Sequence, residues 1–342
     1  MPVTEILRAP EQVRAIVPEW DALSLRDPAT SPYDSGTLMT GLGDLAPCPG
    51  TPYVITARSD AGALIGVLPL RRARNPSRLG GSRLTGYTTW HTSYFDATID
   101  PAVPGAGAAL LGALPAQRDW DRCDLSFIRP DGNLLTMRNL MADSERTGSG
   151  SSRLVHPPAD DAATGVDQVM SRKTAKRLAR VGSVHFEPAV PIAQIPEALR
   201  RFAAMHTARW HGFGAAAEFS EPGNAQQLER VIVEAARAGW ARVGTLSVAG
   251  EVIATHIAFR WRRTQYSWRM AHDAEWQARS PGRLLLSLMI ADAFAAGCER
   301  CDLGRGEEPY KELWATETRP LVRVMLRGRT WRARLAALRA GA

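Results

Sequence analysis

The sequence predicts an α/β fold built from two tandem copies of one unit, each with a mixed central sheet flanked by helices. Its 342 residues, 45% hydrophobic and 23% charged, suffice for two domains of ordinary size. In each half, strand-like runs are followed by a long helical run and a further strand. The segment from Pro104-Gly105 to Cys123-Asp124-Leu125 has a counterpart running from Pro281-Gly282 to Cys301-Asp302-Leu303. These matched ends indicate an internal duplication.

The first half begins with helical spacing and continues with strands. Apolar residues recur at helical spacing over residues 10–23, with a kink expected at Pro18, and a second helix follows Ser35. We then expect strands at 53–56, 63–71, 83–88 and 93–98, a helix at 105–116 and a strand at 123–127. A Gly/Ser-rich run at 147–152 and a Pro-rich turn at 156–161 indicate the linker, so we place the first domain at residues 1–150.

The second half repeats this order after the linker, and we place the second domain at residues 162–342. Its helices are expected at 166–181, 195–209, 224–239 and 281–296. Its strands are expected at 184–188, 241–248, 252–261, 265–271, 300–304 and 322–327, with a hairpin turn at 248–251.

Charge divides the chain unevenly. Residues 1–170 hold 15 Arg and 19 acidic residues, a net charge of −4, so the whole-chain totals of 42 and 35 leave 27 basic and 16 acidic residues in the rest, a net charge of +11. We expect an anionic ligand in the basic half. Three basic residues are lysine (Lys173, Lys176 and Lys311) and 39 are arginine, so these positions are candidates for a role that requires an ammonium.

Other sequence features exclude several classes of protein. The longest apolar stretches are shorter than the ~20 residues of a membrane span, and the N-terminus lacks a basic region followed by an apolar run, so we expect a cytoplasmic protein without a span. Four scattered cysteines do not form a disulfide framework, and we expect Cys298 and Cys301 to be buried thiols. No spacing of His and Cys predicts a metal site.

Three segments carry a resemblance to a known family. They are Met205–Trp210, Trp276–Leu285 with its Ser-Pro-Gly helix start, and Cys301–Trp314 with the pattern D-x-G-R-G-x-x-x-Y-K. Together they resemble the CelD/BcsL-type acetyltransferases, which are double-GNAT relatives of the FemABX aminoacyl-tRNA-dependent transferases. The resemblance is strong over residues 170–314 and weaker over 10–150, where Trp20 and Tyr94-Phe95-Asp96 fit the pattern. It implies two tandem GNAT-like domains, with the chemistry in the second.

The resemblance also implies a set of site residues. The catalytic candidates are Lys311, Asp302, Arg305, Tyr310 and Glu308, with Lys311 polarising the carbonyl that is attacked. The donor-binding candidates are Arg279, Ser280, Pro281, Gly282 and Arg283, together with Lys173 and Arg177. The acceptor-binding candidates are His206, Arg209, Trp210, Tyr94 and Asp96.

Structural alternatives stand beside these roles. Lys311 could be a surface lysine beside Trp314, Asp302 a cap on the Gly304 loop, and His206 a hydrogen-bonded structural histidine. Arg172, Lys173, Lys176, Arg177 and Arg180 would form one stripe on a helix, either as an anion-binding face or as a solvated face.

The identity of the donor stays open at this point. We expect no tightly bound cofactor, and we expect acyl-CoA as co-substrate with a small-molecule, peptide or sugar acceptor. Leu284 stands where GNAT enzymes have a small residue beside the pyrophosphate, which keeps aminoacyl-tRNA, and thus tRNA as a partner, as the alternative. A non-catalytic assembly factor is the third interpretation. The loop at 128–133 lacks a Tyr-Lys pair, so the first domain is expected to be degenerate and to build the acceptor pocket. The sequence does not indicate which oligomeric state the protein adopts.

Overall fold

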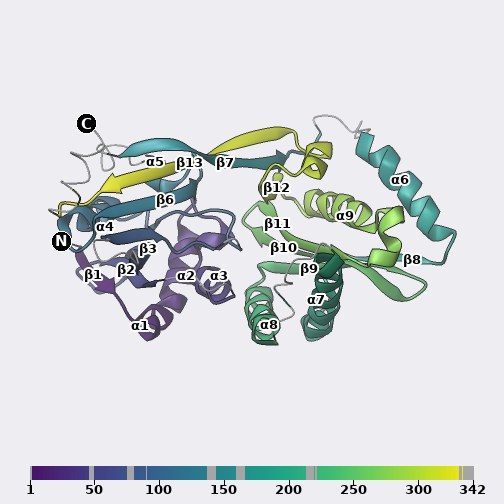
Figure 1. Ribbon diagram of the computed structural model, residues 1–342, viewed down its shortest axis with the longest axis horizontal. Coiled ribbons are helices and arrows are strands. Elements are labelled where there is room, and N and C mark those ends of the chain that lie inside the picture. Colours follow the sequence, from purple (N-terminus) through teal and green to yellow (C-terminus); the bar gives the residue numbers. More distant parts are fainter. Residues whose placement is uncertain are drawn as a thin grey trace. The chain divides into compact units, whose positions relative to one another are not determined.

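The protein folds into two compact units, Met1–Gly150 with Pro320–Ala342, and Ser151–Arg319. The computed structural model describes residues 2–45, 50–74, 81–89, 91–136, 144–158, 166–212, 219, 222–330 and 333. Each unit contains a mixed sheet flanked by helices (Figure 1). The predicted α/β fold with two tandem units is confirmed.

The first unit is built on a sheet with the order β1-β2-β3-β4-β6-β13. The strands are β1 (Val3–Leu7), β2 (Thr51–Arg58), β3 (Leu64–Arg74), β4 (Ser82–Gly86), β6 (Arg122–Ile128) and β13 (Glu317–Arg327), and the short β5 (Thr98–Ile99) pairs with β3. The helices are α1 (Pro10–Ala15), α2 (Val17–Arg26), α3 (Gly36–Gly43), α4 (Ala106–Ala116) and α5 (Asn133–Thr136).

The second unit is built on a sheet with the order β7-β12-β11-β10-β9-β8. The strands are β7 (Glu145–Val155), β8 (Val184–Glu187), β9 (Ala241–Val248), β10 (Glu251–Trp261), β11 (Thr264–His272) and β12 (Arg300–Arg305). The helices are α6 (Val166–Ala179), α7 (Ile195–Gly212), α8 (Pro222–Arg237) and α9 (Pro281–Ala295), with 3-10 helices η5 (Ala274–Arg279) and η6 (Pro309–Leu313).

The two units share one topology, as the duplication predicts. In each, four antiparallel strands lead through a crossover helix, α4 or α9, to a strand that pairs in parallel, β6 with β4 and β12 with β11. An antiparallel strand then pairs with that parallel strand, but the chain exchanges these partners: β13 pairs with β6, and β7 pairs with β12. Residues 320–342 therefore cluster with the first unit, whereas the sequence analysis assigns 162–342 to one domain.

Three element predictions differ from the structure. The Gly/Ser-rich run that precedes the expected linker lies inside the 11-residue strand β7, and the division between the two units falls within this strand, between Gly150 and Ser151. Within this run Ser152 pairs with Arg305 of β12, and the Ser149 and Ser151 hydroxyls make hydrogen bonds with the Phe127 amide and the Glu307 carboxylate. Of the strand expected at 93–98, only Thr98 lies in a strand, the two-residue β5, and the mostly exposed strand β1 was not predicted.

Helices cover both faces of each sheet. Residues 52–57 of β2 and 253–259 of β10 are buried without alternation, which requires packing on both sides. Figure 1 shows α7 and α8 on the face of the second sheet opposite α9. Leu178 of α6 and Leu284 of α9 belong to one apolar cluster with β9 and β10. Among the described helices, none combines the length and the apolar character needed to cross a membrane.

A buried carboxylate fastens β13 to the first unit. The Asp124 side chain on β6 is 2% exposed and pairs with three arginines, Arg83 at 2.6 Å, Arg122 at 3.5 Å, and Arg323 of β13, whose Nε donates to Oδ1 at 2.7 Å. Burial pushes the pKa of Asp124 upward, but hydrogen bonds and charges from Arg323 and Arg83 outweigh it, so the pKa lies below its usual value.

We expect Asp124→Asn to lower the free energy of unfolding at pH 7 by about 1–3 kcal/mol, because it weakens charge-assisted hydrogen bonds at a buried site. A carboxyl with a depressed folded pKa stabilises above its unfolded pKa of about 3.9 and loses that effect as the pH falls through the folded pKa. The difference between the variant and the wild type, measured by urea unfolding, should therefore shrink below about pH 4. Asp44→Asn, at an exposed helix end, serves as the control. Equal effects of the two substitutions would contradict this account of β13.

Candidate functional site

The loop that follows β12 is held in place by β7. The Gly306 amide donates to the Ser151 carbonyl at 3.0 Å, and the Thr316 amide donates to the Leu154 carbonyl at 2.8 Å. Between these points, Ser151 Oγ donates to Glu307 Oε1 at 3.1 Å. Gly306 has φ +112, and a Cβ there would lie 2.4 Å from Glu308 Oε2, so the loop requires glycine at this position.

Lys311 lies within this loop, on η6, and its side chain is 4% exposed. Its Nζ donates to the Arg305 carbonyl at 2.6 Å and lies 2.8 Å from Glu308 Oε2. An ammonium has three N–H donors, and two have acceptors within the described part of the chain. The burial does not fit the alternative of a solvated surface lysine.

Two other residues of this loop, Glu308 and Tyr310, have shifted pKa values. Burial acts to raise the pKa of Glu308, but the hydrogen bond and charge of Lys311 bring it below its ordinary value. Desolvation of the Tyr310 hydroxyl, together with the negative charge of Glu308, raises its pKa to about 12, against the charges of Arg209 and Arg269. At neutral pH the loop thus presents an ionised carboxylate and a protonated phenol.

Asp302 and Arg305 shape the same loop. Asp302 is 3% exposed, and its Oδ1 accepts a hydrogen bond from the Gly304 amide at 2.8 Å. This contact is the cap that the sequence analysis gives as the structural alternative. Arg305 contributes its carbonyl oxygen to Lys311, in a segment flanked by Gly304 and Gly306, which both have positive φ. The structure thus places Asp302, Arg305, Glu308, Tyr310 and Lys311 in one strand-loop element.

The predicted donor-binding segment forms the junction of η5 and α9. Ser280 has φ +51 and precedes Pro281, the first residue of α9. Gly282 is buried, and a Cβ there would lie 3.2 Å from His272 Nδ1. The guanidinium of Arg279 lies over the Trp276 ring at 5.3 Å, and that of Arg283 lies over the Trp314 ring at 5.8 Å.

The two groups of acceptor-binding candidates have different surroundings. His206 is 8% exposed and packs against Phe202 and Phe219, with ring centroids 5.7 and 5.0 Å away. Arg209, on the same helix α7, is exposed, and its charge acts on Tyr310 and on His272. The side chain of Trp210 lies outside the described residues.

Tyr94 and Asp96 belong to the first unit and are buried in its interior. Tyr94 is 0% exposed and contacts Tyr33 edge to face at 5.9 Å. Asp96 accepts hydrogen bonds from the amides of Asn133 and Leu134 at 2.7 and 2.9 Å. Burial and the charge of Asp34, opposed by Arg129, raise its pKa. These contacts stabilise the start of α5.

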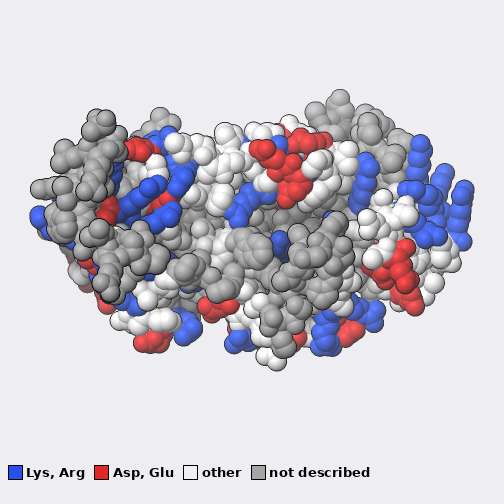
Figure 2. All heavy atoms as spheres, viewed as in Figure 1, with Lys and Arg blue, Asp and Glu red and all other residues white. Residues whose placement is uncertain are grey.

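The basic stripe is an exposed face of α6. Thr174 and Leu178 are buried against the unit, whereas the five cations of the stripe, Arg172, Lys173, Lys176, Arg177 and Arg180, are exposed. Figure 2 shows Lys and Arg gathered where Figure 1 places α6. The five residues lie within nine consecutive positions, from α6 to the residue after its end, which corresponds to about 12 Å at the helical rise.

Three residues that lie beside candidate site residues were not predicted from the sequence. Arg153 and Ser151 of β7 bind the loop after β12, with Arg153 Nε donating to Glu312 at 2.5 Å. They were not predicted because the Gly/Ser-rich composition of β7 is typical of a linker rather than a strand. His272, at the end of β11, has an Nδ1 without a hydrogen-bond partner in the described part of the chain, and burial and the charge of Arg209 lower its pKa. Because His272 lies only seven residues before Arg279 in the sequence, it could have been predicted as a neighbour of the donor-binding segment.

The second unit also contains two cysteine thiols. Cys298 and Cys301 are free and buried, as expected, and burial raises the pKa of both. Among the described residues, no group of three or more His, Cys, Asp and Glu side chains is arranged to hold a metal ion.

Comparison with known proteins identifies the domain that contains this loop. Residues 170–312 match the family described as "Acetyltransferase (GNAT) domain". The chain therefore carries a GNAT acetyltransferase domain in its second unit. No curated protein matches the sequence.

Solved structures show the same fold over nearly the whole chain. The C-terminal DUF2156 domain of an Agrobacterium fabrum protein is 17% identical with a TM-score of 0.60, and the match covers 96% of each chain. FemX is 11% identical with a TM-score of 0.59, covering 93% of this chain and 96% of its own. L-PGS from Bacillus licheniformis is 12% identical with a TM-score of 0.55, covering 97% and 96%. At these identities the similarity establishes the fold alone.

The Glu308–Lys311 contact makes a prediction about titration. Because the hydrogen bond and the charge of Lys311 help to lower the pKa of Glu308 against burial, Lys311→Met should raise the pKa of Glu308. Carbon-13 NMR of labelled glutamate carboxyls measures this directly. Glu317, whose pKa is lowered by His156 and Arg319, should titrate unchanged and is the internal control. An unchanged pKa of Glu308 would contradict the arrangement described for the loop.

Proposed function

We propose that this protein is an acyltransferase whose second unit transfers an activated acyl group from acyl-CoA to an amine or hydroxyl of a small-molecule, peptide or sugar acceptor. One observation carries the proposal. Within a GNAT domain, the ammonium of Lys311 is buried in the loop that follows β12 and has one N–H donor without an acceptor in the described part of the chain. A fixed, desolvated donor of this kind is suited to stabilise charge that develops on an oxygen.

The reaction is a direct displacement. The nitrogen or oxygen of the acceptor attacks the thioester carbonyl, the carbon–sulfur bond breaks, and the acceptor loses one proton. Lys311 stabilises the negative charge on the carbonyl oxygen in the transition state. Glu308, half exposed and ionised, is the candidate to receive the proton, with Tyr310 and Arg305 positioning the loop.

The start of α9 supports acyl-CoA as the donor. Leu284, which departs from the small residue of GNAT enzymes, is 3% exposed and packs into the apolar cluster beneath the helix. Its side chain therefore does not line the outer surface of the loop. Arg279 and Arg283 flank a helix start whose amides and dipole favour an anion, such as the pyrophosphate of CoA.

The stripe on α6 favours a second candidate, an aminoacyl-tRNA-dependent transferase like the FemABX enzymes. Five exposed cations along about 12 Å of helix match the phosphate spacing of a nucleic-acid strand better than a single pyrophosphate. Lys173 and Arg177 are the members of this stripe that the sequence analysis assigns to the donor. The fold shared with FemX is compatible with either donor.

The biological setting follows from the resemblance to CelD/BcsL-type proteins. We infer a role in polysaccharide or natural-product biosynthesis, in the cytoplasm, where both donors are available. We propose that His206, Arg209 and Trp210 on α7 contribute to acceptor binding. Tyr94 and Asp96 of the first unit are buried, so we propose that they contribute indirectly, by stabilising the structure around them.

Donor identity can be tested by calorimetry. We expect coenzyme A and acetyl-CoA to bind with micromolar affinity, and Arg279→Ala to weaken that binding at least tenfold because it removes a phosphate contact. Arg263→Ala, at an exposed ion pair with Glu299, is the matched control. Bulk aminoacylated tRNA should bind weakly at 50 and 200 mM salt. Absence of CoA binding together with saturable, salt-sensitive tRNA binding would replace the first candidate by the second.

Loss of the ammonium should affect turnover more than donor binding. We expect Lys311→Met to lower kcat by about 10²–10³-fold with little change in the Kd of the donor, because its contact strengthens in the transition state. Product formation with the donor that binds, followed by mass spectrometry over a panel of amines and sugars, is the assay. Arg263→Ala should retain full activity. Unchanged kcat in Lys311→Met would refute the mechanism, and turnover by the wild type excludes an assembly factor without activity.

A further inference from the structure

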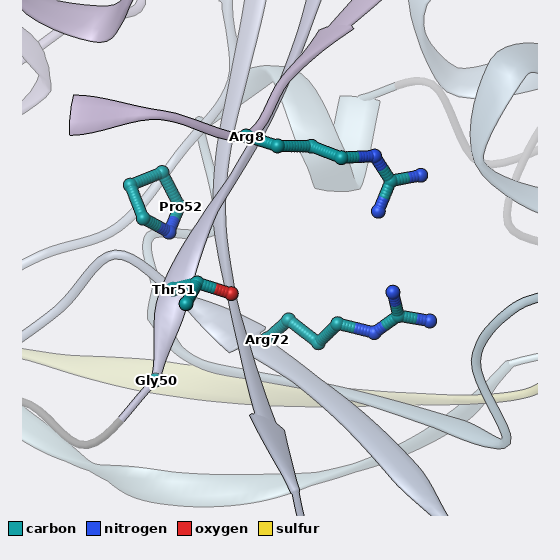
Figure 3. Close-up of a pocket in the computed structure, with 5 residues that line it drawn as sticks. All are labelled: Arg8, Gly50, Thr51, Pro52 and Arg72. Carbon is teal, nitrogen blue, oxygen red and sulfur yellow. The ribbon is translucent and has the colours of Figure 1, made fainter. Parts of the chain in front are cut away.

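The first unit contains a cavity of about 390 Å³ whose lining residues take no part in the proposed reaction. It is lined by Arg8, Gly50, Thr51, Pro52 and Arg72. Arg8 follows the last residue of β1, and Arg72 of β3 pairs with Thr51 of β2. Figure 3 shows both arginine side chains extending to the same side of β2, with their guanidinium groups facing a shared space.

A tyrosine and an aspartate hold the two arginines in this position. The guanidinium carbons of Arg8 and Arg72 lie 4.6 and 5.7 Å from the centroid of the Tyr53 ring. Asp119 Oδ2 accepts from Arg8 Nη2 at 2.8 Å and lies 3.2 Å from Arg72 Nη2, while the Tyr53 hydroxyl donates to Asp119 Oδ1 at 2.7 Å. The Tyr53 ring and the Asp119 carboxylate thus hold both guanidinium groups in position before any ligand binds.

The charges of this cluster do not balance. Burial acts to raise the pKa of Asp119, but the hydrogen bonds from Tyr53 and Arg8 and the charges of both arginines bring it below its usual value, so the carboxylate is ionised at neutral pH. Two guanidinium groups and one carboxylate leave a single net positive charge. A monoanion neutralises it, whereas a dianion would exceed it and be repelled by Asp119.

The arginines also have unused donors. Arg72 donates through Nε to Ser82 Oγ at 2.7 Å and through Nη2 to the backbone carbonyl of Asp119, and it forms an ion pair with the Asp119 carboxylate. The Arg8 guanidinium donates through Nη2 alone. Within the described part of the chain, both Nη1 groups lack an acceptor. The side chains of Arg8 and Arg72 are 46% and 24% exposed, and both line the cavity. A guanidinium presents paired N–H groups that match the two oxygens of a carboxylate.

We propose that this cavity binds the carboxylate group of a small organic acid. The net charge of the cluster selects a monoanion over a phosphate dianion, and the Thr51 hydroxyl on the cavity wall offers a further polar contact. The volume is in the range of small-molecule sites. Asp119 already shows that the arginine pair accommodates a carboxylate at hydrogen-bonding distance. The proposal concerns the first unit and does not depend on the reaction proposed for the second.

The test uses saturation-transfer NMR with acetate as the probe, at constant ionic strength maintained with sodium chloride. We expect saturable binding that Arg8→Ala weakens at least tenfold, the loss that corresponds to one charge-assisted hydrogen bond. Arg8→Lys keeps the charge but loses the paired donors, so it should also weaken binding. Arg58→Ala, at an exposed ion pair with Glu19 at the other end of β2, is the matched control and should bind as the wild type does.

A second variant tests the charge argument. Asp119→Asn leaves two positive charges and removes the competing carboxylate, so it should bind acetate roughly tenfold more tightly and should also bind inorganic phosphate. In the wild type, phosphate should displace acetate only at higher concentration than acetate itself requires. Phosphate displacing acetate more readily in the wild type would overturn the assignment. Acetate binding that is unaffected by Arg8→Ala and Arg8→Lys, or lost equally in Arg58→Ala, would overturn the site.

Discussion

The pairing of β7 with β12 is the constraint on which the candidate site depends. Without β7, β12 would be an edge strand, and the loop after it would have no fixed partner. With β7 in place, the backbone of Ser151 and Leu154 holds the loop at Gly306 and Thr316, and Arg153 holds it at Glu312. Lys311 lies between these points, so its ammonium is fixed by the sheet rather than by its own flexible side chain. Fixed donors in a dry site are what stabilisation of a developing charge requires.

The two repeats use the same topological position differently. In the first unit, the segment after β6 is turned inward: Arg129 is 4% exposed and lies 3.7 Å from Asp34, and Asp96 caps α5. In the second unit, the segment after β12 carries Glu308, Tyr310 and Lys311, and two of these are exposed. A duplicated fold thus has one copy whose loop stabilises its own core and one whose loop presents polar groups. This contrast is consistent with chemistry in the second unit.

The sequence predicted the fold well where periodicity and matched segments were informative. The helices α4 and α9, the strands β9 to β12 and the two-unit plan follow from apolar spacing and from the repeated Pro-Gly and Cys-Asp-Leu ends. The exchange of β7 and β13 was not predictable, because strand pairing over long sequence separation leaves no local signal and β7 has the Gly/Ser composition of a linker. For the same reason, Ser151 and Arg153 were missed. Tyr94 and Asp96 were singled out by resemblance, but their burial could be learned only from packing.

The central claim is that the ammonium of Lys311 faces the reacting group of the donor. The chain has three lysines, so labelling with lysine carrying carbon-13 at Cε gives three NMR signals that can be assigned with single Lys→Arg variants. On titration with acetyl-CoA, the account predicts a saturable shift of the Lys311 signal that coenzyme A alone reproduces only in part, since it lacks the acyl carbonyl. Shifts confined to Lys173 and Lys176, or no shift at saturation, would contradict the assignment of the site to Lys311.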